Sequence, residues 1–272
     1  MSRNPAAAAT TLALVMGLIA LPAIAQTPAP AAEAQATRAP AGAEARAAYD
    51  RMDPLARSVF WATEQELNPA DPVAGVRLAQ ALRELRRYDQ AAEAAQRTLV
   101  VQPDNVEALL ELGRAHIARG QAFYGVAPLE KARSIAANDW RPLSLLGVAY
   151  QQVRRGDDAR AAWNEGLRLS PDNPDILTNA AMALASEGNA PAAETLLRRA
   201  VAQPSATLKV RQNLAMVLGL QGKTAEAEQI LRRDLPPEVA DRNLQWLNSR
   251  QTAADTAATS GNARTWSSLQ DQ

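Results

Sequence analysis

The sequence predicts an all-α fold, a solenoid of stacked helical hairpins, and three observations support this prediction. Small and apolar residues recur at a fixed period of 34 residues, a length that suits two short helices and their turns. The chain is rich in Ala, which is the best helix former, and aromatic residues make up only 4% of it. Gly and Pro recur near fixed places within the period, where the short helices have to end.

Composition excludes several classes of function. Lys and Arg number 29 and Asp and Glu also number 29, so the formal net charge is zero. A chain with no basic excess has no general electrostatic attraction for nucleic acid or acidic lipid. The absence of Cys and the single histidine, His116, exclude thiol chemistry and multi-histidine metal sites. No nucleophile motif or phosphate-binding loop is visible, so we expect neither a cofactor nor an enzyme.

The N-terminus reads as an export signal. A positively charged start precedes the uncharged apolar stretch 6–21, and small residues follow at Ala23 and Ala25. We expect residues 1–25 to be a secretory signal peptide cut after Ala25, which would place the mature chain in the periplasm. The alternative is an uncleaved anchor, but the apolar run is shorter than the ~20 residues that span a bilayer. With no Cys to carry a lipid, a lipid anchor is excluded.

The segments on either side of the periodic region have different compositions. Residues 26–43 are rich in Ala and Pro and read as a disordered linker, and the polar segment 251–272 reads as a disordered tail. Residues 44–71 read as capping helices or a degenerate sixth repeat, with Phe60 and Trp61 covering the first full repeat. Residues 237–250 read as a C-terminal capping helix, whose two inward leucines are Leu244 and Leu247.

Five repeats follow one another without insertion, and positions are numbered from 1 within each. Their boundaries are 72–105, 106–139, 140–173, 174–207 and 208–241. Position 8, where the two helices of a hairpin should cross closely, is always small: Ala79, Gly113, Gly147, Ala181 and Ala215. Position 20 is likewise always Ala or Gly. A turn glycine occupies position 15 as Gly120, Gly188 and Gly222, whereas Arg86 stands there in the first repeat and Gly156 lies two places late in the third. The turn geometry of those two repeats is therefore left open.

This pattern resembles the tetratricopeptide-repeat (TPR) family, whose hairpins stack into a right-handed superhelix that binds proteins or peptides. In that family the first helix of each hairpin lines an inner groove. Carried over position by position, the resemblance implies a protein-binding groove formed by Arg77, Gln80, Arg83, Glu111, Arg114, Arg141, Ser144, Gln151, Thr178, Asn179, Lys209, Gln212 and Asn213. Asn179, Lys209 and Asn213 partly match the clamp with which some members hold a peptide carboxylate. Ser144 and Val148 depart from that clamp, so a generic groove is favoured.

Other conspicuous residues have simple structural interpretations. His116 is expected to pack between helices as a structural histidine. The acidic residues Glu107, Glu111 and Glu130 are expected on solvated helix faces. The arginine doublets are expected at helix ends, where they suit the negative end of the helix dipole, and a basic binding face is the weaker alternative. These doublets are Arg86-Arg87, Arg154-Arg155, Arg198-Arg199 and Arg232-Arg233.

A closer resemblance covers most of the periodic region. Residues 210–247 are similar to the C-terminal part of the TadD family, the TPR proteins of the tight-adherence (Tad or Flp) pilus machinery, with the DLPPE junction at Asp234–Glu238 as the most specific feature. The resemblance implies an accessory factor for pilus assembly and secretion, with an outer-membrane secretin or another pilus component as partner. Members of that family are often lipoproteins, and this chain departs from them in lacking Cys. The alternative is a general periplasmic adaptor for envelope complexes unrelated to pili.

Overall fold

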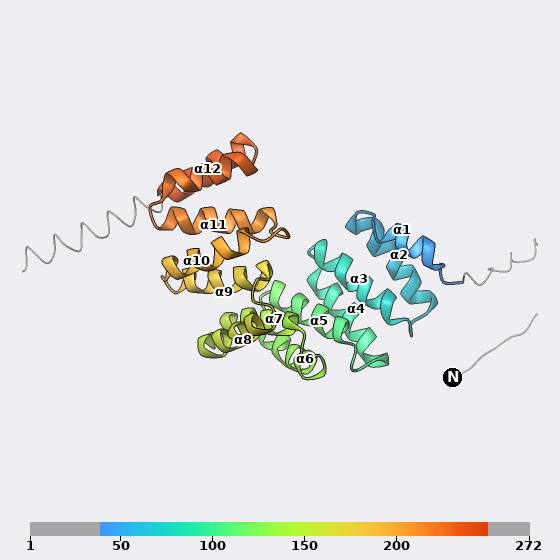
Figure 1. Cartoon of the computed structure of the whole chain (residues 1–272). Helices are drawn as coiled ribbons and strands as arrows, with labels where there is room; N and C mark the ends of the chain where they lie inside the picture. Colours follow the sequence, from blue (N-terminus) through green and yellow to red (C-terminus); the bar gives the residue numbers. More distant parts are fainter. Residues whose placement is uncertain (1–38, 250–272) are drawn as a thin grey trace, which may run out of the picture. The chain divides into compact units, whose positions relative to one another are not determined.

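The computed structural model describes residues 39–249, and every regular element in that range is a helix. The all-α class predicted from the sequence is confirmed (Figure 1). The labelled helices are α1 (Ala43–Tyr49), α2 (Pro54–Leu67), α3 (Pro72–Glu84), α4 (Tyr88–Val101), α5 (Val106–Ala118), α6 (Ala122–Ile135), α7 (Trp140–Gln152), α8 (Gly156–Leu169), α9 (Pro174–Ser186), α10 (Ala190–Val201), α11 (Leu208–Leu220) and α12 (Thr224–Asp234). Residues 237–249 form a further helix.

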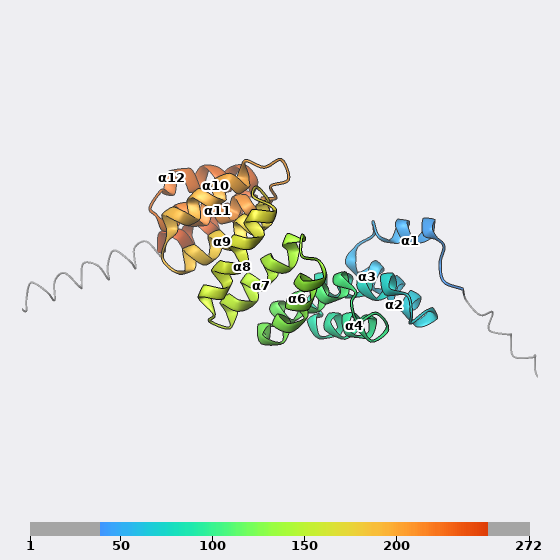
Figure 2. The same ribbon diagram turned by 60° about the horizontal axis from the view of Figure 1, so that its bottom comes forward.

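The helices from α3 to α12 pair into five hairpins, each with a first helix A and a second helix B. The A helices α3, α5, α7, α9 and α11 begin at the five residues where the 34-residue repeats are expected to begin. Each A helix packs against the next A helix, and each B helix packs against its own A helix and the following one. The hairpins therefore follow one another in sequence order, as both views show (Figures 1 and 2). The A helices together form one continuous face.

A short polar residue precedes four of the five A helices. The side-chain oxygens of Asp71, Asn105, Asp139 and Asn173 each accept a hydrogen bond from a backbone N–H in the first turn. These bonds satisfy amide groups that have no partner within the helix. Thr207 stands before α11 and makes no such bond. Position 34 of the repeat is thus a recurrent helix cap.

All five turns between helix A and helix B have the same geometry. The residue at position 15 has a positive φ in every repeat, including Arg86 at 61° and Arg154 at 64°. The next N–H donates to the carbonyl five residues earlier, for example Arg155 to Tyr150 and Asn189 to Leu184, both at 2.8 Å. The turns of the first and third repeats, left open by the sequence, therefore match those that contain glycine.

The arginine doublets divide into two kinds. Arg198-Arg199 and Arg232-Arg233 lie in the last turns of α10 and α12, as expected. The other two doublets lie beyond the ends of α3 and α7, and Arg87 and Arg155 stand directly before the B helices. In these two doublets, Arg86 and Arg154 directly follow the C-caps of α3 and α7, whereas Arg87 and Arg155 stand at the start of the next helix, where the dipole is positive.

Small residues at position 8 are required by direct contact with the B helix. A Cβ atom added to Gly113 would lie 2.5 Å from Leu129, and one added to Gly147 would lie 2.2 Å from the indole of Trp163. Trp163 is itself buried, and its Nε1 donates to the carbonyl of Ser144 at 3.1 Å. The ring is therefore held in place over the glycine that accommodates it.

Both ends of the hairpin stack are covered by additional helices. Trp61 of α2 is 1% exposed and packs with Ala74, Leu78 and Ala79 of α3. Phe60 is partly buried against the same cluster and stacks on Tyr49 with ring centroids 3.9 Å apart. At the other end, Leu244 and Leu247 of the helix 237–249 are buried against α11 and α12.

Some sequence-based expectations lie outside the described residues. These are the signal peptide 1–25, the linker up to residue 38, the final residue of the capping segment and the tail 251–272. Within residues 39–249, no helix combines the length and apolar character needed to cross a membrane.

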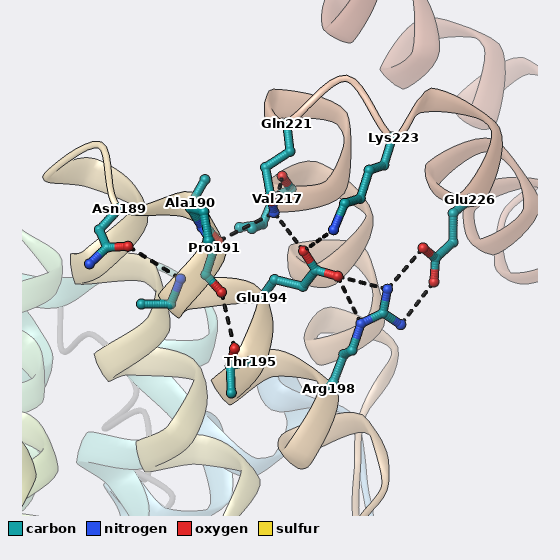
Figure 3. A network of polar contacts seen from close by, with 11 residues as sticks. Asn189, Ala190, Pro191, Glu194, Thr195, Arg198, Val217, Gln221, Lys223 and Glu226 are labelled. Carbon is teal, nitrogen blue, oxygen red and sulfur yellow. Dashed lines mark hydrogen bonds and ion pairs between the residues drawn. The ribbon is translucent and has the colours of Figure 1, made fainter.

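One carboxylate, Glu194 of α10, bridges the last two hairpins through polar contacts (Figure 3). It accepts hydrogen bonds from Lys223 Nζ at 2.6 Å, Gln221 Nε2 at 2.8 Å and Arg198 Nε at 2.9 Å. Arg198 extends the network to Glu226 of α12. The hydrogen bond from Lys223, supported by those from Gln221 and Arg198 and opposed by burial, lowers the pKa of Glu194 to about 2.

We expect Gly147→Ala to destabilise the fold by about 1–3 kcal/mol, because the added methyl group overlaps the buried indole of Trp163. The free energy of unfolding in urea measures the effect. Gly156→Ala is the matched control, since the nearest atom lies 3.7 Å from the added Cβ and is the end of a flexible arginine. Equal stabilities for the two variants would contradict the close contact at position 8.

We expect the stability contributed by Glu194 to depend on pH. Its pKa in the folded chain is below the ordinary value of 4.5, so the contribution is complete above that value and is lost as pH falls towards 2. At neutral pH, Glu194→Gln should cost about 2 kcal/mol, the usual scale for charged hydrogen bonds. Urea unfolding of both proteins across this range should show the gap closing below pH 4.5. A gap that stays constant down to pH 2 would contradict the assignment.

Candidate functional site

The continuous face of the A helices contains a hollow of ≈ 390 Å³. Five consecutive A helices, α3, α5, α7, α9 and α11, contribute to its wall. Its lining residues are Arg83, Arg114, Trp140, Arg141, Ser144, Leu145, Asp175, Thr178, Asn179, Thr207, Lys209 and Val210. Because each hairpin supplies one to four of these residues, the site exists only when the stack is assembled.

Two arginines of the hollow share one buried carboxylate. Arg83 Nε lies 2.8 Å from Glu111 Oε2, and Arg114 Nη1 lies 2.5 Å from Glu111 Oε1. The Glu111 side chain is 1% exposed, whereas those of Arg83 and Arg114 are 30% and 26% exposed. The expectation that Glu111 lies on a solvated face was wrong, and it cannot contact a partner directly. Its role is to fix the two guanidinium groups from beneath.

Arg141 is positioned by carboxylates on either side. It bonds Asp139, the residue that caps its own helix, and Glu107 of the preceding A helix at 2.7 Å. Hydrogen bonds from Arg141, assisted by the charge of Arg114 and opposed by burial, hold the pKa of Asp139 below its usual value. These pairs keep the cap ionised and the arginine facing the hollow.

Uncharged polar groups lie beside the arginines. Asn179 Nδ2 donates to Ser144 Oγ at 2.9 Å, which links α9 to α7. Ser144 is 3% exposed and Thr178 is 7% exposed, and Thr178 Oγ1 has no hydrogen-bond partner among the described residues. Lys209 and Asp175 also line the hollow, and both are exposed.

Eleven of the thirteen predicted groove residues line one of three hollows. Seven line the main hollow: Arg83, Arg114, Arg141, Ser144, Thr178, Asn179 and Lys209. Arg77 and Gln80 line a second hollow of ≈ 250 Å³, and Gln212 and Asn213 line a third of ≈ 440 Å³. Gln151 lines none of these and donates instead to Ser186 Oγ at 2.9 Å. Asn179 and Lys209 line the main hollow, and Asn213 lies one turn after Lys209 on α11 and lines the third hollow.

Five residues of the main hollow were not among the predicted ones. Asp175 and Leu145 occupy positions 2 and 6, which the family geometry assigns to the groove, so the repeat register could have found them. The other three line the hollow because of how neighbouring hairpins pack, and repeat positions alone do not predict that packing. These residues are Trp140, Thr207 and Val210.

His116 is a half-buried residue of α5, and its ring centroid lies 5.9 Å from that of Tyr124. Burial and the nearby charge of Arg119 lower its pKa, which favours the neutral imidazole. Between residues 39 and 249, no three His, Cys, Asp or Glu side chains are grouped so that they could hold a metal ion. The polar side chains that line the hollow can form hydrogen bonds and ion pairs.

Sequence profiles of the tetratricopeptide repeat match residues 76–122, 144–207 and 207–235, about half of the chain. These matches lie within the region from α3 to α12 and leave most of α6 unmatched, and the chain belongs to the tetratricopeptide-repeat family. Proteins of this family are typically non-catalytic scaffolds that bind protein or peptide partners. No curated protein sequence matches the chain.

Solved structures share the fold at low sequence identity. A thermophilic TPR protein from Thermus thermophilus is 24% identical, and the match covers 68% of this chain and 98% of that one with a TM-score of 0.57. A TPR protein from Parabacteroides merdae is 13% identical, with 70% and 76% covered and a TM-score of 0.61. PilF from Pseudomonas aeruginosa is 18% identical, with 74% and 97% covered and a TM-score of 0.56. At these identities the similarity establishes the solenoid alone.

We expect Glu111→Gln to destabilise the fold by about 2 kcal/mol, because it leaves two neighbouring guanidinium groups without their shared buried charge. Urea unfolding measures the loss. Glu93→Gln is the control, since Glu93 forms an exposed pair with Arg97 on α4 and should change stability by less than about 0.5 kcal/mol. A Glu111→Gln variant as stable as the control would show that the buried carboxylate does not organise the site.

Proposed function

We propose that this protein is a periplasmic scaffold that takes part in Tad/Flp-type pilus assembly and catalyses no reaction. In this proposal the main hollow holds a segment of a pilus-machinery protein, an outer-membrane secretin among the candidates. The observation that carries the proposal is the hollow itself, to which five consecutive hairpins contribute.

The composition of the hollow favours a polypeptide ligand. Guanidinium groups from Arg83, Arg114 and Arg141 can donate to backbone carbonyls and to acidic side chains, and the Asn179 amide can both donate and accept. Trp140 and Leu145 add apolar contact. An extended segment presents carbonyls, amides and side chains at regular intervals, and a groove with this mixture can follow it over several residues.

The TadD resemblance supports the pilus role, and its most specific feature has a visible structural purpose. Asp234, the first residue of the DLPPE junction, accepts from Arg211 Nε at 2.6 Å and so ties the end of α12 to α11. Leu235 and Pro236 then lead into the helix 237–249. The junction sets the position of a terminal helix that the repeat pattern alone does not specify.

Site-specific photocrosslinking in the bacterium that encodes the protein tests the proposal. A photoreactive residue replaces Lys209, which lines the main hollow and is exposed. The control places the same residue at Glu93, whose side chain is 65% exposed on the B helix α4. We expect Lys209 to crosslink to a secretin or another Flp-pilus protein and Glu93 to give no such product.

Two other outcomes are informative. Crosslinks from Lys209 to an unrelated envelope complex, while pilus proteins are expressed, would contradict the pilus role. They would still agree with a scaffold that binds other proteins. N-terminal sequencing of the recovered protein should begin at Gln26, and a sequence beginning at Met1 would remove the proposed cleavage of the export signal.

A further inference from the structure

The turns between helix A and helix B form an edge of the stack that the proposed binding groove does not use. In the first three hairpins this edge carries Arg86, Arg87, Arg119, Arg154 and Arg155. Successive A helices pack side by side, so the three turns are neighbours, and Arg119 of the second turn bonds Asp89 of the first hairpin. These five arginines, together with Phe123 and Tyr124, are termed the turn edge.

Two of these arginines occupy a backbone conformation that favours glycine. Arg86 and Arg154 have φ of 61° and 64°, whereas the same turn position holds Gly120, Gly188 and Gly222 in the other hairpins. A residue with a Cβ atom in the left-handed region costs about 1–2 kcal/mol. The other hairpins form the same turn with glycine, so the strained arginines do not stabilise the fold. Strain that the fold does not need points to a function of the side chains.

Only part of the charge of the turn edge is neutralised locally, because three of its five arginines form no ion pair among residues 39–249. Four nearby carboxylates are already paired, Glu84 with Arg57, Asp89 with Arg119, Asp157 with Arg160 and Asp158 with Arg155, and Glu130 accepts a hydrogen bond from Tyr150. Arg86, Arg87 and Arg154 pair with no carboxylate of residues 39–249. All three are exposed, as is Arg155, whose guanidinium lies 4.4 Å from the centre of the Tyr150 ring. At least three positive charges therefore face outward from this edge without a counterion.

Two exposed aromatic side chains lie next to these charges. Phe123 is 73% exposed and Tyr124 is 61% exposed, and both lie in the first turn of α6, directly after the second A–B turn. Their rings contact each other at 5.6 Å between centroids. Aromatic residues are enriched at membrane–water interfaces, where the ring enters the headgroup region.

We propose that the turn edge docks the protein on the surface of an anionic phospholipid bilayer. The unpaired arginines attract the lipid phosphates, and Phe123 and Tyr124 enter the interface beside them. The three turns follow one another along the same edge of the stack, so these groups can meet one partner surface together. Such contact would hold the scaffold at a membrane surface.

Vesicle sedimentation with the purified mature chain tests this inference. Vesicles of phosphatidylglycerol and phosphatidylcholine are compared with vesicles of phosphatidylcholine alone. We expect binding to the anionic vesicles that weakens as salt is raised, because the interaction is screened. The variant Arg86→Gly/Arg154→Gly should bind about 25-fold more weakly, at about fivefold for each arginine lost from a membrane contact.

This variant keeps loss of binding distinct from loss of fold. Glycine is the preferred residue at both positions, so the thermal midpoint should be equal to or above that of the wild type. The matched control is Arg97→Gln/Arg168→Gln, which removes two exposed arginines from the B helices α4 and α8 and should bind as the wild type does.

Three results would overturn the inference. One is equal binding of the wild type to neutral and anionic vesicles. Another is equal loss of binding in the turn variant and the control, because this would show that binding depends on the overall charge and not on the turn edge. The third is salt-sensitive retention of the wild type on immobilised polyglutamate with no binding to anionic vesicles, which would assign the edge to an acidic polypeptide.

Discussion

The close crossing of the two helices within each hairpin is the contact on which the rest of the structure depends. At position 8 the A helix must present Ala or Gly, because the side chain at position 24 of the B helix packs directly over it, as Leu129 does on Gly113 and Trp163 on Gly147. This contact brings the helices together along an apolar seam that neither could bury alone. It also fixes the direction in which the A helix faces, and so determines which side chains reach the groove.

Neighbouring hairpins are joined by polar contacts as well as by the apolar core. Lys131 and Arg199 stand at position 26 of their repeats and donate to the carbonyls of Pro103 and Pro171 in the preceding repeat, at 2.7 and 3.0 Å. Both also pair with the Asp that follows the proline. The other repeats lack either the cation or the Pro-Asp pair, and there the B helix uses other partners, such as Glu165 with Arg133. The junctions are therefore individual, although the hairpins are alike.

Period and residue size were enough to predict the fold, because the helix crossing restricts position 8 directly and leaves a signal in every repeat. The Asp and Asn caps at position 34 recur just as regularly and are also visible in the sequence. The groove was predicted less completely. Positions within the repeat predicted seven of the residues that line the main hollow. They did not predict that Glu111 is buried beneath Arg83 and Arg114. Burial of a charged side chain depends on which cations approach from the neighbouring helices, and those distances are not encoded in one repeat.

Net charge was the least informative quantity, and the structure shows why. A net charge of zero gives the balance of positive and negative side chains over the whole chain, but not where each charge lies or which charges are paired. Some carboxylates of the hairpins pair with groove residues, namely Arg83, Arg114 and Arg141, and others pair at the last junction with Lys223 and Arg198. Each ion pair removes one positive and one negative charge, so a local surplus arises where an arginine such as Arg87 has no carboxylate partner among residues 39–249. Arg86 and Arg154 add to that surplus at positions where glycine would give the same turn with less strain. A neutral solenoid can therefore present a basic edge, because its repeats fix the backbone and leave the turn side chains free to vary.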